Sequence, residues 1–279
     1  MGYSWPMSAE TPVFIRYARL PFAGVEAMRA HTARAFSRHT HDQYGIGIVD
    51  AGGHSSWSGR GQVEAGPGAF IIVNPGEVHD GAPIGGRSRA WRILYFEPEA
   101  LAALRADVLE GAAREFMFAA PVFADASLRA AFETALAFGG AGVDADSSRA
   151  CEEALLVLTA RLGAHSGAGH ESRAGAAPAV RRARERIDAE PEAPISLREL
   201  AAESGVSRFQ LIRGFQRAVG LSPHAYIVQR RLAIARRLLR AGHAPGDVAV
   251  RAGFYDQSHF GRCFIRQFGV APARYALLS

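Results

Sequence analysis

The feature that most constrains this chain is a pattern in its last third that occurs twice. The first copy consists of Leu211, Arg213, Phe215, Arg217, Val219, Gly220, Pro223 and Tyr226. The second copy follows at a constant offset of 49 residues and consists of Phe260, Arg262, Phe264, Arg266, Phe268, Gly269, Pro272 and Tyr275. Two copies in one register indicate two copies of one structural unit.

The local chemistry of the first copy indicates two short helices joined by a tight turn. Ser196 and Glu199 form a capping-box pattern that predicts a helix start, and Gly205 suits the left-handed turn that ends this helix. A second capping box at Ser207–Gln210 starts a helix that we expect to run to about Val219. Two short helices around a glycine turn are typical of the helix–turn–helix of DNA-binding proteins, although an ordinary helical hairpin has the same local pattern.

One face of each second helix is apolar, and the opposite face is predicted to meet DNA. The outward residues of the first copy and its flanks are Arg208, Phe209, Ile212, Arg213, Gln216 and Arg217, and those of the second are Gln257, Ser258, Arg262 and Arg266. Arg213 and Arg262 occupy the same outward position in both copies, which suits bidentate reading of guanine. Arg208, Arg217 and Arg266 are better placed to contact phosphates.

Residues from about 180 to 279 resemble the DNA-binding domain of the AraC/XylS family of bacterial transcription regulators. The matching runs are LRELAAESGVSRFQLIRGFQRAVGLSPHAYIVQRRLAIARRLL and VAVRAGFYDQSHFGRCFIRQFGVAPARYA. The resemblance implies a long helix, here about Pro223–Ala241, between the two units. At about 1.5 Å per residue this helix is about 27 Å long, which would hold the two reading helices roughly one DNA turn apart.

Charge divides the chain into two parts and supports two domains. Residues 179–279 contain 17 arginines and 8 acidic residues, whereas residues 1–178 contain 15 arginines and 19 acidic residues. Only the C-terminal part has the positive charge expected of a nucleic-acid binder. Cys151 and Cys263 lack metal-site or CxxC spacing, and the chain shows no signal peptide or apolar run of about 18 residues. We therefore expect a cytoplasmic protein that does not enter a membrane.

The N-terminal part has the pattern of an all-β barrel or jelly roll. Short apolar or alternating runs separated by glycine-rich turns predict strands at 13–19, 25–31, 44–50, 54–58, 69–73 and 90–96. The segments His39-Thr-His41 and Gly66–His79 resemble those of the cupin-like sensor domain found in many AraC/XylS members. The fold class predicted for the whole chain is therefore multidomain α+β, with a cupin-like barrel and packed helices followed by an all-α domain.

A barrel of this size can enclose one small ligand. We expect its pocket to be lined by aromatic and polar residues near the two cupin-like segments, namely His41, Tyr44, Trp57, His79, Trp91 and Tyr95, each of which could equally be core packing. His39, His41 and His79 could together bind zinc or iron. However, Tyr44-Gly-Ile-Gly-Ile stands where a metal-binding cupin has a glutamate, so we expect no metal or other cofactor.

Residues 98–163 return to helical spacing and complete the sensor after the barrel of residues 1–97. Three apolar stripes are expected, formed by Leu101, Leu104, Val108 and Leu109, by Leu128, Phe132 and Leu136, and by Ala154, Leu155, Leu158 and Leu162. The last helix could pair with a second copy of the chain or pack on its own barrel. Residues 164–178 have the composition of a flexible linker, and residues 179–279 form the DNA-binding domain.

These features predict a sequence-specific transcription regulator rather than an enzyme. The expected partners are promoter DNA, a small-molecule effector, RNA polymerase if the protein is an activator, and a second copy of the chain if it dimerises. The alternatives are a metal-dependent cupin enzyme fused to a DNA-binding domain and an architectural DNA binder. Outward arginines in the reading helices argue against the latter, because architectural proteins rely on backbone and minor-groove contacts.

Overall fold

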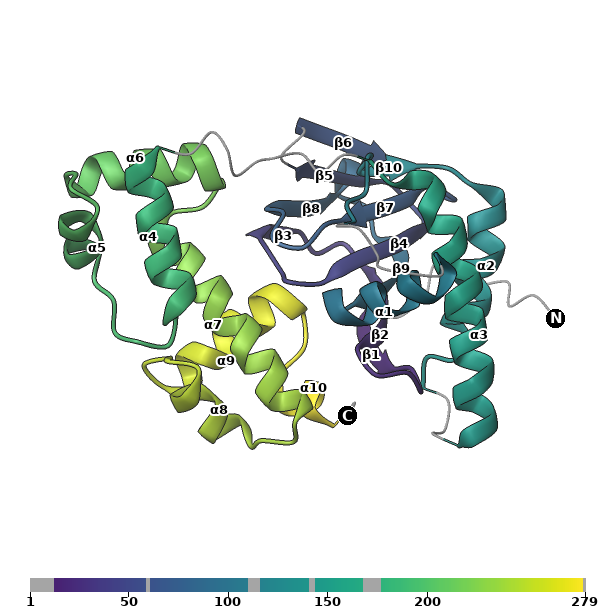
Figure 1. Ribbon diagram of the computed structural model, residues 1–279. Coiled ribbons are helices and arrows are strands. Elements are labelled where there is room, and N and C mark those ends of the chain that lie inside the picture. The colour runs from purple at the N-terminus through teal and green to yellow at the C-terminus, as the bar shows by residue number, and fades with distance from the viewer. Residues whose placement is uncertain (1–12, 59–60, 110–115, 141–143, 168–176, 278–279) are drawn as a thin grey trace.

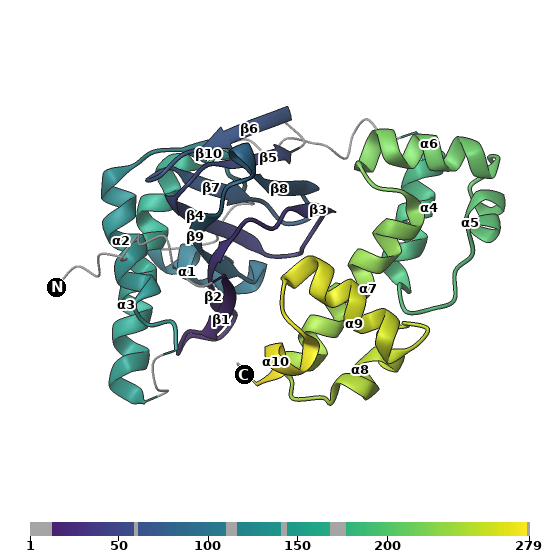
Figure 2. The same ribbon diagram turned by 180° about the vertical axis from the view of Figure 1, so that it is seen from behind.

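The computed structural model describes residues 13–58, 61–109, 116–140, 144–167 and 177–277 (Figure 1). The leader proposed for residues 1–10, and most of the proposed linker, lie outside these ranges. A β-domain is followed by a helical domain that lies beside it, as both views show (Figures 1 and 2). Within the described residues, no helix combines the length and the apolar character needed to cross a bilayer.

Two antiparallel sheets form the β-domain. The larger sheet has the order β1-β2-β9-β4-β7-β10, and its strands are β1 (Phe14–Arg19), β2 (Val25–Thr32), β9 (Arg89–Phe96), β4 (Tyr44–Ala51), β7 (Phe70–Val73) and β10 (Val122–Phe123). The smaller sheet has the order β3-β8-β5-β6, and its strands are β3 (Phe36–His39), β8 (His79–Pro83), β5 (His54–Ser58) and β6 (Gly61–Ala65). The prediction of a cupin-like β-domain followed by a helical domain is confirmed.

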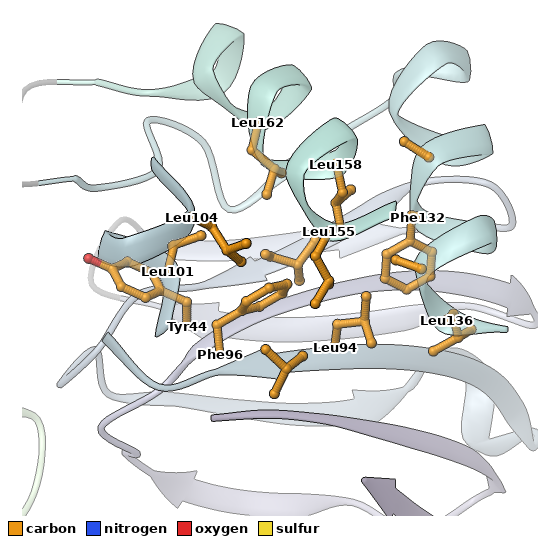
Figure 3. Close-up of a cluster of buried hydrophobic side chains, with 14 of the residues drawn as sticks. Tyr44, Leu94, Phe96, Leu101, Leu104, Phe132, Leu136, Leu155, Leu158 and Leu162 are labelled. Atoms are coloured by element: carbon orange, nitrogen blue, oxygen red, sulfur yellow. The ribbon is translucent and has the colours of Figure 1, made fainter. Parts of the chain in front are cut away.

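Three helices cover one face of the larger sheet: α1 (Pro98–Val108), α2 (Ala126–Leu136) and α3 (Ala145–Leu162). Their apolar stripes pack on every second residue of β4 and β9, such as Ile46 and Leu94, which are fully buried (Figure 3). By sequence, the apolar stripe of α3 could serve as a dimer contact. Instead it packs into this core, since Leu155 and Leu158 are also fully buried. The stripe of α1 ends earlier than predicted, because Leu109 is 54% exposed.

The first residues of the proposed linker belong to the β-domain. A 3-10 turn at Gly163–His165 follows α3 directly, and the His165 ring stacks on Phe123 with 3.8 Å between ring centroids. His165 Nε2 also lies 2.9 Å from a carboxylate oxygen of Asp125, the residue that caps α2. The sequence predicted no partner for this histidine, because its partners are about 40 residues away in the chain.

The helical domain consists of α4 (Pro178–Ala189), α5 (Leu197–Glu203), α6 (Arg208–Val219), α7 (Pro223–Arg240), α8 (Pro245–Arg251), α9 (Gln257–Phe268) and α10 (Pro272–Ala276). Both predicted capping boxes are present, at Ser196 and at Ser207, and each satisfies a free backbone N–H at its helix start. The long helix α7 ends one residue earlier than expected. It connects the two helix–turn–helix units, α5–α6 and α8–α9 (Figure 1).

Candidate functional site

The two helix–turn–helix units expose the same face of their second helices. In α6, Leu211 and Phe215 are buried, and in α9 Phe260 and Phe264 are buried, as the four-residue spacing predicted. The turn of the second unit requires glycine: Gly253 has φ +79°, and a Cβ there would lie 2.3 Å from the Glu192 carbonyl oxygen. The units therefore hold α6 and α9 by equivalent packing.

The residues predicted to meet DNA lie on these exposed faces. Ile212 is half-buried, and the others are exposed, namely Arg208, Phe209, Arg213, Gln216, Arg217, Gln257, Ser258, Arg262 and Arg266. None of the five arginines forms an ion pair within the described part of the chain, whereas Arg184, Arg186 and Arg230 of α4 and α7 do. A row of unpaired guanidinium groups is the electrostatic arrangement that phosphate and base contacts need.

A cavity lies on the side of the larger sheet that faces away from α1–α3. It has about 880 Å³ of space, a figure that includes open solvent at its mouth. Its walls come from both sheets, and most are apolar, with Met28, Ile71 and Ile93 among them. Gly47 of β4 leaves room for the Ile93 side chain in the cavity wall, because a Cβ at position 47 would lie 2.6 Å from that side chain.

Four of the six predicted pocket residues line this cavity: His41, His79, Trp91 and Tyr95. Tyr44 does not, because its neighbour Gly45 faces the cavity and successive residues of a strand point to opposite faces. Its side chain packs under α1 instead, and its hydroxyl donates to the Phe116 carbonyl at 2.6 Å (Figure 3).

Trp57 also lies outside the cavity wall. On β5, His54, Ser56 and Ser58 face inward, so Trp57 faces outward. It packs near Gly220, the residue that ends α6, and carries the Arg38 guanidinium 4.0 Å above its ring. Tyr44 and Trp57 are thus each adjacent in the strand to a residue that lines the cavity, and their own side chains point to the opposite face.

Sequence reasoning missed His54, Ile93 and two residues from the other domain, Gln267 and Phe268. Period-two alternation between Trp91 and Tyr95 would have identified Ile93. The same alternation from Trp57 leads to Ser55 and away from His54, so it would not have identified His54. No local signal identifies Gln267 or Phe268, because they reach the cavity only through the packing of the two domains.

Three histidines cluster at one side of the cavity. The ring centroids of His39 and His79 are 4.3 Å apart, and those of His41 and His79 are 5.0 Å apart. Each Nδ1 faces a backbone carbonyl at 2.8–3.1 Å, which fixes the proton on Nδ1 and leaves Nε2 as an acceptor. Burial, together with the neighbouring rings, lowers the pKa of each to about 3, so all three are neutral near pH 7. Among the described residues, no group of three or more His, Cys, Asp or Glu side chains is arranged to hold a metal ion.

Comparison with known proteins agrees with this arrangement. An AraC-like ligand-binding domain model matches residues 22–156, and a helix–turn–helix domain model matches residues 200–277, so that together they cover most of the chain. The chain belongs to the AraC family. It is a transcription regulator with an N-terminal ligand-binding domain and a C-terminal helix–turn–helix DNA-binding domain.

Individual relatives of this AraC-family chain support the same division. The HTH-type transcriptional regulator YbfI of Bacillus subtilis, itself uncharacterised, is 27% identical over 246 residues, which is 86% of each chain. MtrA of Neisseria gonorrhoeae is 38% identical over 86 residues, which is 30% of this chain and 29% of MtrA. Solved structures of ToxT from Vibrio cholerae have the same fold: the apo form of a ToxT variant gives a TM-score of 0.57 at 11% identity and covers 93% of this chain and 99% of that chain.

In this AraC-family protein the DNA-binding domain closes one side of the cavity. Phe268, at the end of α9, lines the cavity, and its carbonyl accepts a hydrogen bond from the Tyr17 hydroxyl of β1 at 3.2 Å. Gln267, beside it, lines the cavity as well and donates to the Thr40 carbonyl at 3.2 Å. The α9 end that closes the cavity therefore belongs to the same helix as the predicted reading residues.

A buried ionic network holds the two domains together beside this wall. Arg236 of α7 lies 3.1 Å from Glu26 of β2 and 2.9 Å from Glu97. Arg240 pairs with Glu97 at 2.6 Å, and the Tyr275 hydroxyl donates to Glu26 at 2.8 Å. Burial acts to lower the pKa of Arg236, but Glu26 and its other neighbours raise it more, so the net pKa is raised and the charge is secure. The network is a specific interdomain contact in which every charge has a partner of opposite sign.

Proposed function

We propose that this regulator senses a small effector in the β-domain cavity and that occupancy of the cavity controls how the helical domain engages promoter DNA. One observation carries the proposal: Gln267 and Phe268 of α9 form part of the cavity wall. A ligand that contacts these residues has different affinity for the docked and the undocked arrangement. Such a difference is the condition for a ligand to shift a conformational equilibrium.

We further propose that Arg213 and Arg262 read base edges and that Arg208, Arg217 and Arg266 contact phosphates. In support, all five are exposed and unpaired within the described residues. The 18 residues of α7 make a spacer of about 27 Å, close to one DNA turn of roughly 34 Å, so one chain could place α6 and α9 in adjacent major grooves. Dimerisation is then not required for recognition of two half-sites.

The task we propose for the cavity is regulation rather than catalysis, since the relatives are transcriptional regulators. ToxT, which shares the fold, has been solved with an unsaturated fatty acid bound. We extend to this chain only that a small organic molecule occupies the cavity. RNA polymerase is the further partner expected if the protein activates transcription, and the cytoplasm is the compartment where such a partner is met.

Sequencing of the genomic fragments that the purified full-length protein retains tests the proposal. The expected result is a motif of two short blocks about one helical turn apart. Retention without any motif would contradict sequence-specific regulation. A second arm compares retention before and after a change at the cavity wall, Gln267→Ala, with Gln62→Ala on the exposed side of β6 as a surface control. Equal effects of the two changes would contradict coupling between the cavity and DNA binding.

A further inference from the structure

A buried arginine without a carboxylate partner lies at one end of the cavity. Arg89, the first residue of β9, has no solvent exposure and forms no ion pair within the described part of the chain. Its Nε donates to His54 Nδ1 at 2.9 Å and its Nη1 donates to the Arg34 carbonyl at 3.1 Å. The remaining nitrogen, Nη2, has no hydrogen-bond partner among the described residues. Buried charges in proteins are normally paired, so the unpartnered Nη2 of Arg89 is a candidate donor to an anion.

Arg89 is not itself one of the cavity-lining residues, but it lies beside two of them, His54 and Gly81, and it shares a strand face with three others. Trp91, Ile93 and Tyr95 line the cavity, and Arg89 is on the same face of the strand because residues two apart share a face. Its guanidinium carbon lies 4.6 Å from the centre of the Trp91 ring. At about 3.3 Å per residue, the distance from Arg89 to Tyr95 along the strand is about 20 Å, so the charge marks one end of an elongated space.

Gly81 of β8 packs closely against His54 and Arg89. His79, two residues earlier on β8, faces the cavity, so a side chain at position 81 would point the same way. A Cβ at Gly81 would lie 3.1 Å from the His54 ring and 3.6 Å from Arg89 Nη2. A Cβ would be crowded against His54, so only glycine lets the backbone at position 81 approach both donors this closely.

The carboxylates that line the cavity are engaged elsewhere. Asp80 accepts a hydrogen bond from the Trp57 backbone at 2.6 Å and faces Arg38 at 3.8 Å. Glu77 accepts two hydrogen bonds from Asn74, both at 3.2 Å. Neither acid is available to neutralise Arg89.

The hydrogen bond from Arg89 also determines which ring nitrogen of His54 carries the proton. Because His54 Nδ1 accepts from Arg89, the neutral ring carries its proton on Nε2, which makes Nε2 a donor. Burial and the adjacent guanidinium lower the pKa of His54 to about 4. Burial lowers the pKa of Arg89 to about 10, so the arginine stays charged near pH 7. This end of the cavity therefore offers donors and positive charge, whereas His39, His41 and His79 present acceptors.

We propose that the effector is a small organic acid whose carboxylate is bound by Arg89 and His54 beside Gly81, with its apolar body along Trp91 and Ile93. This inference rests on the proposed effector-binding function and gives the chemical class of the ligand. A carboxylate there accepts from His54 Nε2 and from the unpartnered Nη2 of Arg89. Charge-assisted hydrogen bonds of this kind are about twice as strong as neutral ones.

The test compares acids with their uncharged amides on the full-length protein. Two matched pairs serve as probes, 4-phenylbutyrate with 4-phenylbutanamide and octanoate with octanamide. Binding is followed by calorimetry and by the tryptophan fluorescence of the protein, to which Trp91 contributes. We expect at least one acid to bind at least about tenfold more tightly than its amide. Equal binding of acid and amide, or no binding of either acid at its solubility limit, overturns the inference.

Variants test whether the preference for the acid over the amide depends on Arg89 and Gly81. In Arg89→Met the preference for the acid should disappear, and in Arg89→Lys part of it should return. Gly81→Ala keeps the charge but presses a methyl group against the His54 ring, so it should weaken binding of the acid without a change at Arg89. Arg16→Met is the control, since it removes a positive charge from the exposed side of β1, where Arg16 forms no ion pair within the described residues. A preference that persists in both Arg89→Met and Gly81→Ala overturns the inference.

Failure of the proposed function gives a different result. If an amide binds as well as its acid and changes DNA retention, the cavity is a sensor but not one for acids. If the acid binds through Arg89 and leaves DNA retention unchanged, the ligand class is correct and the coupling is wrong.

Discussion

Removal of Arg236 should separate the two domains. The Arg236 side chain is only 5% exposed and contacts Glu26, which is equally buried, and Glu97. In Arg236→Met, Glu26 would remain buried in the docked state with the Tyr275 hydroxyl still donating to it. The charge can be rehydrated without unfolding either domain, because the contact lies between domains.

The magnitude follows from the burial of the pair. Breaking a buried ion pair by removing one partner costs about 3–5 kcal/mol, because an uncompensated charge is left behind. At about 1.4 kcal/mol per tenfold change, the docking equilibrium should shift by between about a hundredfold and a few thousandfold. The hydroxyl of Tyr275 still donates to Glu26 at 2.8 Å, which favours the lower part of this range.

Calorimetry and small-angle X-ray scattering measure the two consequences. We expect the thermal unfolding of Arg236→Met to split into two transitions and the radius of gyration to increase. Arg237→Met, the next residue of α7, is a matched control, because its side chain is 58% exposed and lies 3.9 Å from Asp42. The double variant Glu26→Gln/Arg236→Met should recover part of the docking, since no isolated charge remains at Glu26.

The reasoning would be refuted if Arg236→Met and Arg237→Met gave the same unfolding profile and the same radius of gyration. It would also be refuted if the double variant were additive, because additivity means that the two side chains do not interact.

Three further predictions concern DNA, pH and the cavity. Arg213→Ala and Arg262→Ala should each cost about 1–3 kcal/mol on the specific site and much less on random DNA in filter-binding titrations; equal losses on both would mean phosphate contact alone. Burial and the neighbouring His41 lower the pKa of His79 from 6.5 to about 3. The stability that neutral His79 provides is therefore full above pH 6.5 and declines as pH falls, by about 2 kcal/mol near pH 5. In urea unfolding, His79→Gln should lose correspondingly less free energy of unfolding between pH 7 and pH 5 than the unchanged protein. Gly47→Ala should lower the free energy of unfolding by about 1–3 kcal/mol, because the added Cβ crowds the Ile93 side chain of β9. An unchanged urea midpoint would mean that β9 can shift to accommodate the methyl group without loss of stability.

The helical domain could be predicted from sequence almost element by element because its signals are local. The capping boxes at Ser196 and Ser207, the cap at Asp256 and the glycine turns each act within four residues, and all are present in the structure. The duplicated pattern added an independent check, since each unit predicted the other.

The β-domain was less predictable because its smaller sheet lacks strong local patterns. β3, β6, β8 and β10 were not predicted as strands, whereas all six predicted strands are present. β8 contains Gly81 and ends at Pro83, and β6 begins with Gly61, residues that propensity assigns to turns. These strands form through pairing with distant partners, so tertiary context overrides local preference.

The cavity shows why two errors occurred in its residue list. Successive side chains of a strand point to opposite faces of the sheet, so an aromatic residue near a site can either line the site or face away from it. Tyr44 and Trp57 fell on the outer face and Trp91 and Tyr95 on the inner one. Hydrophobicity cannot separate these cases here, because both faces of β4 and β9 are buried: one under helices α1–α3 and the other at the cavity.

The chain contains no lysine, so arginine has to serve two opposed purposes in the helical domain. On α7, Arg236 and Arg240 are buried against carboxylates of the β-domain, where their charge is neutralised and specifies a docking geometry. On α6 and α9, Arg213 and Arg262 are exposed and unpaired within the described residues, where their charge remains free for DNA. Net charge predicts that the domain is basic but not which arginines are free, because pairing depends on the face of each helix that meets the sensor. The docking contact and the exposed arginines are thus distinguished by geometry alone. Under the proposed function, a ligand that alters the docking would change how α6 and α9 are presented without touching Arg213 or Arg262.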